Sequence, residues 1–455
     1  MIPAQQVIDI ALAAAHGGGT ETIVIVTDTA EATLRWAGNS MTTNGVATSR
    51  TTTVVSIDLD AHGARVGALT SAEVDPGLIP ALVASSARAA AAAPTARDAA
   101  PLVSGSDVPA DWDAELPATG PEVFVDLASS LNRGFGGTDQ LYGFARHEVA
   151  TTFLASSTGL RRRFTEPTGT VEINAKRGGA SAWVGISSPD FAEVDCDGLL
   201  EQLSRRLSWA ARTVELPAGR YETLMPPSTV ADMMIYLGWT MSGRGAQEGR
   251  TALSMPGGGT RVGERLSELP FTLYSDPHAF GMQCLPFVAT ASSSETVSVF
   301  DNGVDIGAVD WIRGGVINAL AYPRAAAAEF GTPVALPAGN LLMTGGTASM
   351  EEMIASTERG LLLTTLWYIR EVDPTTLLLT GLTRDGVYLV EDGAVRAAVN
   401  NFRFNESPLD LLRRATQAGV AEPTLPREWG DWATRAVMPS LRIPDFHMSS
   451  VSQAQ

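Results

Sequence analysis

The first part of the chain alternates between helical and strand-like spacing of its apolar positions. Residues 4–15 place apolar side chains three to four positions apart, and the glycines at 17–19 would end a helix there. A second helix is predicted from about residue 80 to 93, before Pro94. Between the helices, alternating and β-branched runs predict strands at 22–28, 32–38, 51–60 and 63–70. Residues 1–93 are therefore predicted to form a small α+β domain, a meander between two helices.

Three further regions follow this domain. Residues 94–120 are rich in Pro, Ala, Asp and Gly without periodicity, which predicts a linker or a long surface excursion. Residues 121–218 are predicted to be a β-rich central region, with paired strands within 146–177 and a helix near 197–212. Residues 219–455 form the last region, which alternates short helices with strand-like runs.

The last region carries the clearest helix and turn signals. Ser228 or Thr229 is placed to cap one helix, and Ser349 with Glu352 forms a capping box for another that would stop at Gly360. A third helix is predicted from Ser407 to Gly419. Turn signals at Asp373-Pro374, Asp385-Gly386 and Asp392-Gly393 predict an antiparallel meander. The predicted class is α+β: an N-terminal helix–meander–helix domain, then a β-rich domain of antiparallel meanders with short helices.

Charge and composition narrow the classes of partner. The formal net charge is −18, and Lys176 is the only lysine, so the surface repels phosphate backbones and nucleic acid is not an expected partner. The first residues lack a basic signal region, and no apolar run of about 18 residues appears, so we expect neither export nor membrane insertion. Two distant cysteines argue against a disulfide framework. We expect a cytoplasmic protein.

The familiar catalytic motifs are absent from the sequence. His147-Glu148 begins like a zinc-protease motif, but no second histidine follows at the required spacing, and the segment has the pattern of a strand. There is no nucleophile elbow or phosphate loop, and Cys196 lies between two aspartates that oppose thiolate formation. From the residues alone, the chain has no visible active site.

A specific resemblance appears in the last region. The segment RGLLLTTLWYIREVDPTTLLLTGLTRDGVYLVEDGAVRAAVNNFRFNESPLDLL, within 352–412, resembles the C-terminal region of TldD/PmbA proteins. The order of Asp301-Asn302-Gly303, Ala338-Gly339-Asn340 and Gly345-Gly346 also fits that family, as does the closing run at 441–450. The N-terminal region resembles the family only in its organisation.

The resemblance implies that this chain is not itself catalytic. Catalytic subunits of the family carry H-E-x-x-x-H on the helix after a proline-containing turn, and a cysteine ligand near the C-terminus. The equivalent helix here, 228–239, has no histidine, and no cysteine follows Cys284. The resemblance therefore implies a zinc-less, TldE/PmbA-type subunit of a cytosolic metalloprotease that processes or degrades unfolded peptides. The implied partners are an extended peptide and a zinc-bearing TldD-like homologue, in a heterodimer or larger complex.

No catalytic residue and no metal ligand are predicted in this chain, and zinc is expected in the partner. Polar residues at the ends of predicted strands are the candidates for peptide or partner contact: Arg370, Asn400, Asn401 and Arg403. Two alternatives stay open. One is a scaffold or peptide-binding homodimer without proteolysis. The other is a stand-alone metal-dependent hydrolase whose site is assembled from scattered groups such as His147, Glu148 and His278.

Overall fold

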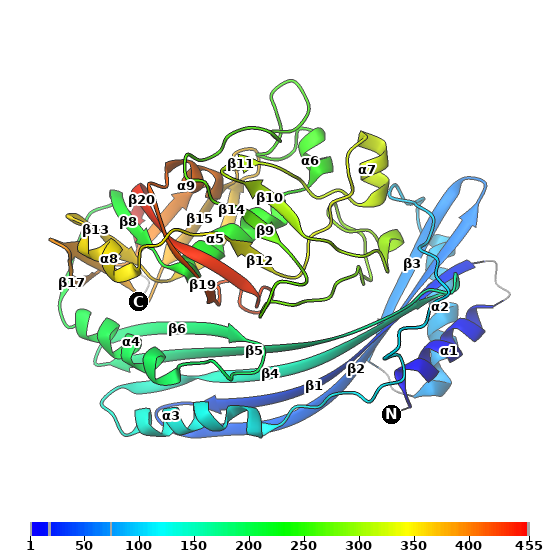
Figure 1. The fold of residues 1–455 in the computed structure, drawn as a ribbon, viewed down its shortest axis with the longest axis horizontal. Coiled ribbons are helices and arrows are strands. Elements are labelled where there is room, and N and C mark those ends of the chain that lie inside the picture. The colour runs from blue at the N-terminus through cyan, green and yellow to red at the C-terminus, as the bar shows by residue number, and fades with distance from the viewer. Residues whose placement is uncertain (1, 17–19, 73–74, 453–455) are drawn as a thin grey trace.

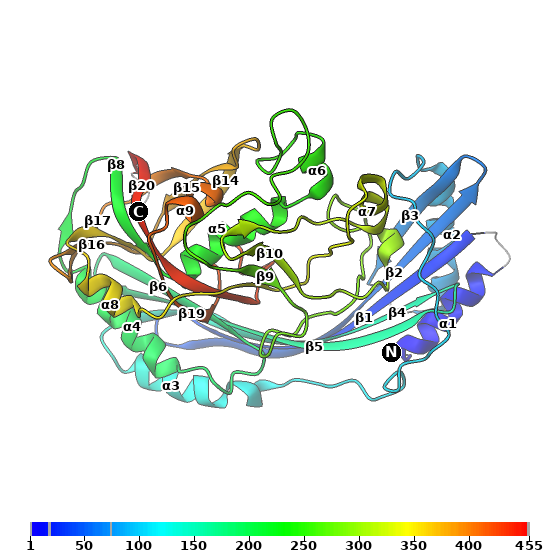
Figure 2. The ribbon, with the colours of Figure 1, turned by 45° about the horizontal axis from the view of Figure 1, so that its top comes forward.

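Two large β-sheets and the helices packed against them make up the molecule (Figures 1 and 2). The computed structural model describes residues 2–16, 20–72 and 75–452. The predicted α+β class is confirmed. The predicted glycine stop at 17–19 lies outside the described residues.

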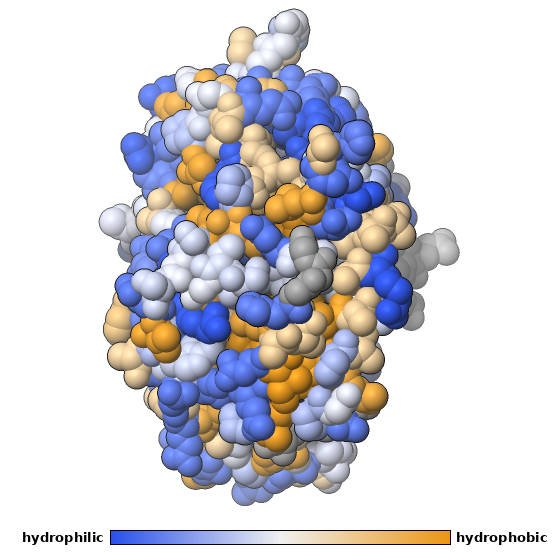
Figure 3. All heavy atoms as spheres, turned by 90° about the vertical axis from the view of Figure 1, so that its right-hand side faces the viewer, coloured by the Kyte–Doolittle hydropathy of each residue, from blue (hydrophilic) through white to orange (hydrophobic). Residues whose placement is uncertain are grey.

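The first sheet consists of six antiparallel strands in the order β3-β2-β1-β4-β5-β6. Its strands are β1 (Thr20–Trp36), β2 (Met41–Asp60), β3 (Gly63–Ser71), β4 (Gln140–Ser156), β5 (Arg161–Arg177) and β6 (Ala180–Ser188). The accompanying helices are α1 (Ala4–Ala15), η1 (Pro76–Leu78), α2 (Ile79–Ala92), η2 (Pro121–Phe124), α3 (Val125–Phe135) and α4 (Cys196–Trp209). At the end of the molecule that carries α1 and α2, apolar residues reach the surface in patches between hydrophilic ones (Figure 3).

The runs predicted as separate strands at 22–28 and 32–38 form one strand, β1. The polar residues between them do not end the strand, because Asp28 lies opposite Arg50 of β2 and is paired with it. Arg50 donates to both carboxylate oxygens of Asp28 at 2.6 Å, and both side chains are buried. The first predicted strand ends at Asp28, whose charge is neutralised by Arg50 on the opposite strand.

The segment 94–120 does not separate two sheets. Strand β1 pairs with β4 along Ile23–Trp36, so the ranges 1–93 and 121–218, predicted as separate regions, contribute strands to one sheet. The segment itself contains no helix or strand and crosses the surface (Figure 1). It is held there by the buried Trp112, whose ring meets that of Phe153 edge-on at 5.4 Å between centroids.

The second sheet belongs to the C-terminal half and mixes antiparallel with parallel pairs. Its strands are β7 (Thr213–Val214), β8 (Gly219–Met225), β9 (Leu273–Ser275), β10 (Val309–Arg313), β11 (Val316–Ile317), β12 (Leu341–Met343), β13 (Arg359–Leu363), β14 (Leu366–Asp373), β15 (Leu378–Thr383), β16 (Val387–Glu391), β17 (Ala394–Val399), β18 (Phe402–Glu406), β19 (Gln417–Thr424) and β20 (Ala436–Val451). The pairs β8–β13, β12–β20 and β7–β17 are parallel. Its helices are α5 (Pro227–Thr240), α6 (Gly243–Gln247), η3 (Val299–Asp301), α7 (Arg324–Phe330), α8 (Met350–Ala355) and α9 (Pro408–Arg414).

The predicted four-run meander is two hairpins. The turns at Asp373-Pro374 and Asp392-Gly393 join β14 to β15 and β16 to β17. At Asp385-Gly386 the chain instead crosses to another part of the sheet, since β15 pairs with β18 and β16 pairs with β13. Gly386 is required at this crossing, because its φ is +154° and a Cβ would lie 1.9 Å from Thr364 Oγ1.

Helix boundaries follow the capping signals in one case and depart from them in others. The capping box of Ser349 and Glu352 is present at α8, although the helix ends at Ala355, before Gly360. Neither Ser228 nor Thr229 caps α5, because the helix already begins at Pro227, whose fixed φ suits a first helical position. The helix predicted up to Gly419 ends at Arg414, since the following residues pair with β20 as strand β19.

Candidate functional site

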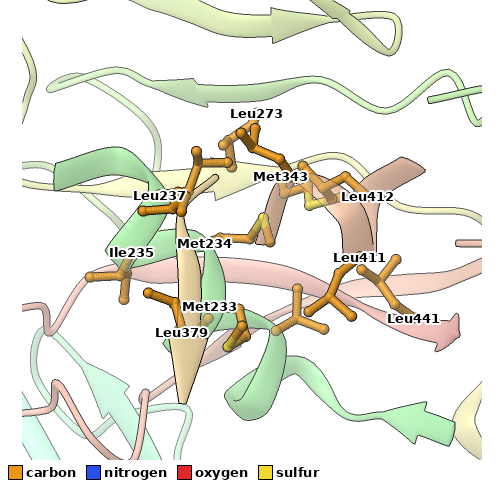
Figure 4. Packing of buried hydrophobic residues seen from close by; sticks show 14 of the residues in the cluster. Met233, Met234, Ile235, Leu237, Leu273, Met343, Leu379, Leu411, Leu412 and Leu441 are labelled. Atoms are coloured by element: carbon orange, nitrogen blue, oxygen red, sulfur yellow. The ribbon is translucent and has the colours of Figure 1, made fainter. Parts of the chain in front are cut away.

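Helix α5 is the element at which the resemblance places catalytic chemistry, and it lies inside the core of the C-terminal half. Seven consecutive residues, Thr229 to Ile235, are buried, together with Leu237. Met233, Met234, Ile235 and Leu237 pack among leucines and a methionine from surrounding elements (Figure 4). Along residues 229–235 the helix is covered on every face, so packing holds its side chains.

Asp232 is the one carboxylate on α5, and it is fully buried. Its Oδ1 accepts the backbone N–H of Glu428 at 2.9 Å, while Oδ2 has no hydrogen-bond partner within the described residues. Burial raises the pKa of Asp232 well above its ordinary range, despite the hydrogen bond from the Glu428 backbone. Asp232, enclosed beneath the 427–429 segment, is a packing element whose side chain makes one hydrogen bond.

Glu428 links this buried carboxyl to the edge of the sheet. Its side chain is 8 % exposed and accepts the backbone N–H groups of Tyr368 and Ile369 at 2.9 and 3.1 Å. The guanidinium of Arg370, a predicted contact residue, reaches the same carboxylate at 3.1 Å. Within the described residues strand β14 pairs with β15 alone, which leaves its other edge open. Glu428 occupies part of that edge, where a peptide carbonyl would bind.

A groove lined by tryptophans passes the end of α5. Trp239 is 49 % exposed and Trp432 is 73 % exposed, and both ring systems meet Trp429, which is buried beneath them, at centroid distances of 5.1 and 6.4 Å. Trp239 lines two cavities: one of about 210 Å³, which Trp432 and Arg435 also line, and one of about 300 Å³ beside Glu371. Such aromatic walls suit apolar side chains of a bound peptide.

Helical spacing in the sequence predicts that Trp239 belongs to the packed face of α5. In the structure, however, about half of this residue is exposed. The apolar period continues through Met233, Met234 and Leu237, but Trp239 lies on the last turn, where the covering elements end. Trp432 lies in a segment without regular structure, so no periodic signal marks it.

The other predicted contact residues lie around the connection between β17 and β18. Asn400 accepts the backbone N–H of Leu216 at 2.7 Å, and the carbonyl of Asn401 accepts that of Ser452 at 2.8 Å. Arg403 is exposed on β18, a strand with neighbours on both sides, and its Nη1 is 3.5 Å from Thr380 Oγ1.

The structure therefore brings two of the four predicted residues near one another. Thr380 lies directly opposite Arg370 on the neighbouring strand, and the guanidinium of Arg403 reaches the same threonine, so both arginines flank it. The side chain of Asn400 and the backbone carbonyl of Asn401 instead accept hydrogen bonds from other segments of the chain.

Two of the three scattered groups considered as metal ligands have side chains engaged elsewhere. His147 is buried, with Nδ1 2.6 Å from Thr119 Oγ1 and Nε2 2.8 Å from the Pro189 carbonyl. The carboxylate of Glu148 pairs with Arg146 on the same strand. His278 is an exposed residue of a turn. Across residues 2–16, 20–72 and 75–452, no group of three or more His, Cys, Asp or Glu side chains is arranged to hold a metal ion. The donors on α5 do not fit a zinc ion either, because its one carboxylate is enclosed.

No helix in the described part of the chain is long and apolar enough to cross a membrane. No curated protein matches the sequence.

Comparison with protein families and solved structures identifies relatives of this architecture. The model of the PmbA/TldA metallopeptidase C-terminal domain matches residues 218–450. TldE from Thermococcus kodakarensis is similar in structure, with a TM-score of 0.77 and 16 % identity over 97 % of this chain and 99 % of that one. A Thermotoga maritima protein described as a proposed modulator of a DNA gyrase has a TM-score of 0.75 and 15 % identity, over 98 % and 100 % of the two chains. A Bacteroides thetaiotaomicron protein with the same description has a TM-score of 0.76 and 13 % identity, over 99 % and 100 %. Since the family model matches half of its residues, this chain belongs to the PmbA/TldD family.

Proposed function

We propose that this chain is the zinc-less subunit of a cytosolic TldD/PmbA-type metalloprotease complex that processes or degrades unfolded peptides. The observation that supports this role is the composition of α5. At the helix where the family's catalytic members carry their zinc ligands, this chain carries buried methionines, isoleucine and leucine, and an enclosed Asp232. The zinc would belong to a homologous partner, and this subunit would supply peptide-binding surface beside it.

The peptide surface that the geometry supports best is the open edge of β14 with the tryptophan groove beside it. Arg370 and Glu371 lie on that strand, and Glu371 also lines the cavity next to Trp239. An extended peptide can hydrogen-bond to the edge while its side chains enter the groove.

Metal content of the untagged chain, measured alone and after co-expression with a zinc-bearing homologue, tests the role. We expect almost no zinc and no peptide cleavage by the isolated chain, and a stable, zinc-containing, proteolytic complex with the homologue. About one tightly held zinc per isolated chain would contradict the proposal. A stable homodimer that binds peptides but no homologue would favour the scaffold alternative.

The groove is tested in the same complex with Trp239→Ala. We expect weaker binding of extended apolar peptides, by roughly tenfold, because loss of an aromatic wall costs about 1–2 kcal/mol. Phe280→Ala removes a 98 % exposed aromatic side chain that lines neither cavity and serves as the matched control. Equal peptide affinity of the two variants would exclude the groove as the binding surface.

A further inference from the structure

Another cavity, lined by residues remote from α5 in sequence, lies where the two halves of the protein meet. Its volume is about 600 Å³, within the range of small-molecule sites. One wall comes from the first sheet and carries Tyr142 of β4 with Asn174 and Lys176 of β5. The opposite wall comes from the second sheet and carries Trp367, Arg384 and Arg427. Ser181 Oγ donates to the Asp385 carboxylate and connects the two walls.

The charge of this lining is opposite to that of the protein. Three cationic side chains and one carboxylate, Asp385, line the cavity, in a chain of net charge −18. Lys176 is the only lysine of the sequence, and among the described residues no carboxylate lies within ion-pair distance of it. Its ammonium lies over the ring of Tyr142, 5.4 Å from the centroid. Arg384 has only a long contact, 3.6 Å, with Asp385. These two cations are available to an anion.

The back of the cavity is aromatic and holds donors without acceptors. The Arg427 guanidinium lies between the rings of Trp183 and Trp367, 5.1 and 4.6 Å from their centroids, and its Nη1 donates to Glu172 at 2.7 Å. Arg427 Nε, Trp367 Nε1 and Thr365 Oγ1 are buried and have no hydrogen-bond partner within the described residues. The first two can only donate, so each lacks an acceptor. Because these three atoms have almost no accessible surface, this wall offers a ligand its aromatic surface.

We propose that this cavity binds a small organic anion. Its carboxylate or phosphate group would meet Lys176 and Arg384, and its aromatic or apolar part would lie against Trp367 and Tyr142. Charge-assisted hydrogen bonds to an ammonium and a guanidinium supply the affinity, and the rings supply the preference for an anion that carries apolar surface. This site needs no partner subunit and no metal, so it is independent of the role proposed for α5.

Three matched probes test the chemistry by calorimetry: N-acetylphenylalanine, its neutral amide and phenyl phosphate. We expect at least one of the two anions to bind and the amide not to bind. Binding of N-acetylphenylalanine alone would identify a carboxylate site, and binding of phenyl phosphate alone a phosphate site. Absence of binding by both anions, or equal binding of the amide, would overturn the proposal.

Variants locate the site. Lys176→Gln and Arg384→Gln should each weaken the anion by about tenfold or more, the usual loss for a charge-assisted bond, while Arg88→Gln on α2 removes one exposed positive charge elsewhere and should leave the affinity unchanged. Circular dichroism verifies that each variant is folded. In addition, the bound anion should slow acylation of Lys176, detected by peptide mass spectrometry. Affinity that is equal in all three variants would place the anion outside the cavity and contradict the inference.

Discussion

At the scale of single residues, the fully buried Asp232 carries a carboxyl group whose ionisation opposes folding. Burial raises its pKa well above the usual range, while in the unfolded chain it titrates near about 4. The folded state therefore retains a proton that the unfolded state releases. This contribution to stability is fully present below pH of about 4 and is lost as the pH rises through the folded-state value.

We predict that Asp232→Asn stabilises the protein at pH 7 and does so progressively less as the pH falls to 4. Asparagine keeps the acceptor for the Glu428 N–H and does not ionise. The gain should be largest at pH 7, because the pKa of Asp232 is raised only in the folded state. Denaturant unfolding of both proteins at pH 4, 5.5 and 7 measures it. A difference that is independent of pH would refute the assignment.

Asp232→Ala is the matched control for this pair. It also removes the ionisable group, but it leaves the Glu428 N–H buried without a partner, so it should be less stable than Asp232→Asn by about 1–3 kcal/mol at every pH.

The two cysteines give a second test at this scale. Burial raises the pKa of the Cys196 thiol to about 12 and that of Cys284 to about 11, so neither forms appreciable thiolate at neutral pH. We expect both to react with Ellman's reagent only in denaturant. Ala61→Cys, in the exposed turn between β2 and β3, supplies a thiol that should react at once in the folded protein. Rapid labelling of the unaltered folded chain would show that one of the buried sites opens.

At the scale of elements, β1 depends on the ion pair that joins it to β2. Asp28 and Arg50 face each other with side chains 8 % and 4 % exposed, and Arg50 Nη1 also donates to the carbonyl of Ile2, just before α1. Arg50→Met alone should destabilise the protein by about 3–5 kcal/mol, because it leaves a buried carboxylate without its partner. Asp28→Leu combined with Arg50→Met should recover most of that loss, which denaturant unfolding of both variants measures. Additive losses would mean that the pair contributes little beyond its packing.

The same pair shows what sequence patterns can predict at this scale. Helix α1 and the capping box of α8 follow from spacing and composition within a few residues, and the sequence indicates both correctly. The length of β1 depends on which residue lies opposite Asp28, and that residue, Arg50, belongs to another strand. The crossing at Asp385-Gly386 has the same cause, since the turn signal is local while the choice of neighbouring strand is not.

The candidate site likewise has some features that the sequence shows and others that depend on the tertiary structure. The absence of histidine from α5 can be seen in the sequence, whereas Arg370, expected at the end of a strand, lies within β14. The exposure of Trp239 and Trp432 could not be predicted, because it depends on where the surrounding elements stop covering α5. Lys176 and Arg384 meet only through the contact between the two sheets, and the sequence places them more than two hundred residues apart.

At the scale of the whole molecule, the first sheet combines strands from before and after segment 94–120. These two parts of the chain therefore depend on one another. Strand β1 lies inside the sheet, with β2 on one side and β4 on the other, so removing either neighbour exposes a long row of unpaired backbone groups. The segment crosses the surface and carries no strand of its own, and near its middle Val108 is 59 % exposed. Cutting the chain there should remove connectivity without removing the pairing.

We therefore predict that a protease site inserted after Val108 can be cleaved without separating the fragments. Size-exclusion chromatography under native conditions should elute both pieces together, with a Tm within a few degrees of the uncut insertion variant, and a denaturing gel should resolve two bands. The pairing of β1 with β4 from Ile23 to Trp36, and the packing of Trp112 on Phe153, hold the pieces together. Separate elution of the N-terminal piece as a folded unit would show instead that residues 1–93 form a domain of their own. Because β1 contributes buried residues to both faces of the sheet, we expect that piece to aggregate when it is expressed alone.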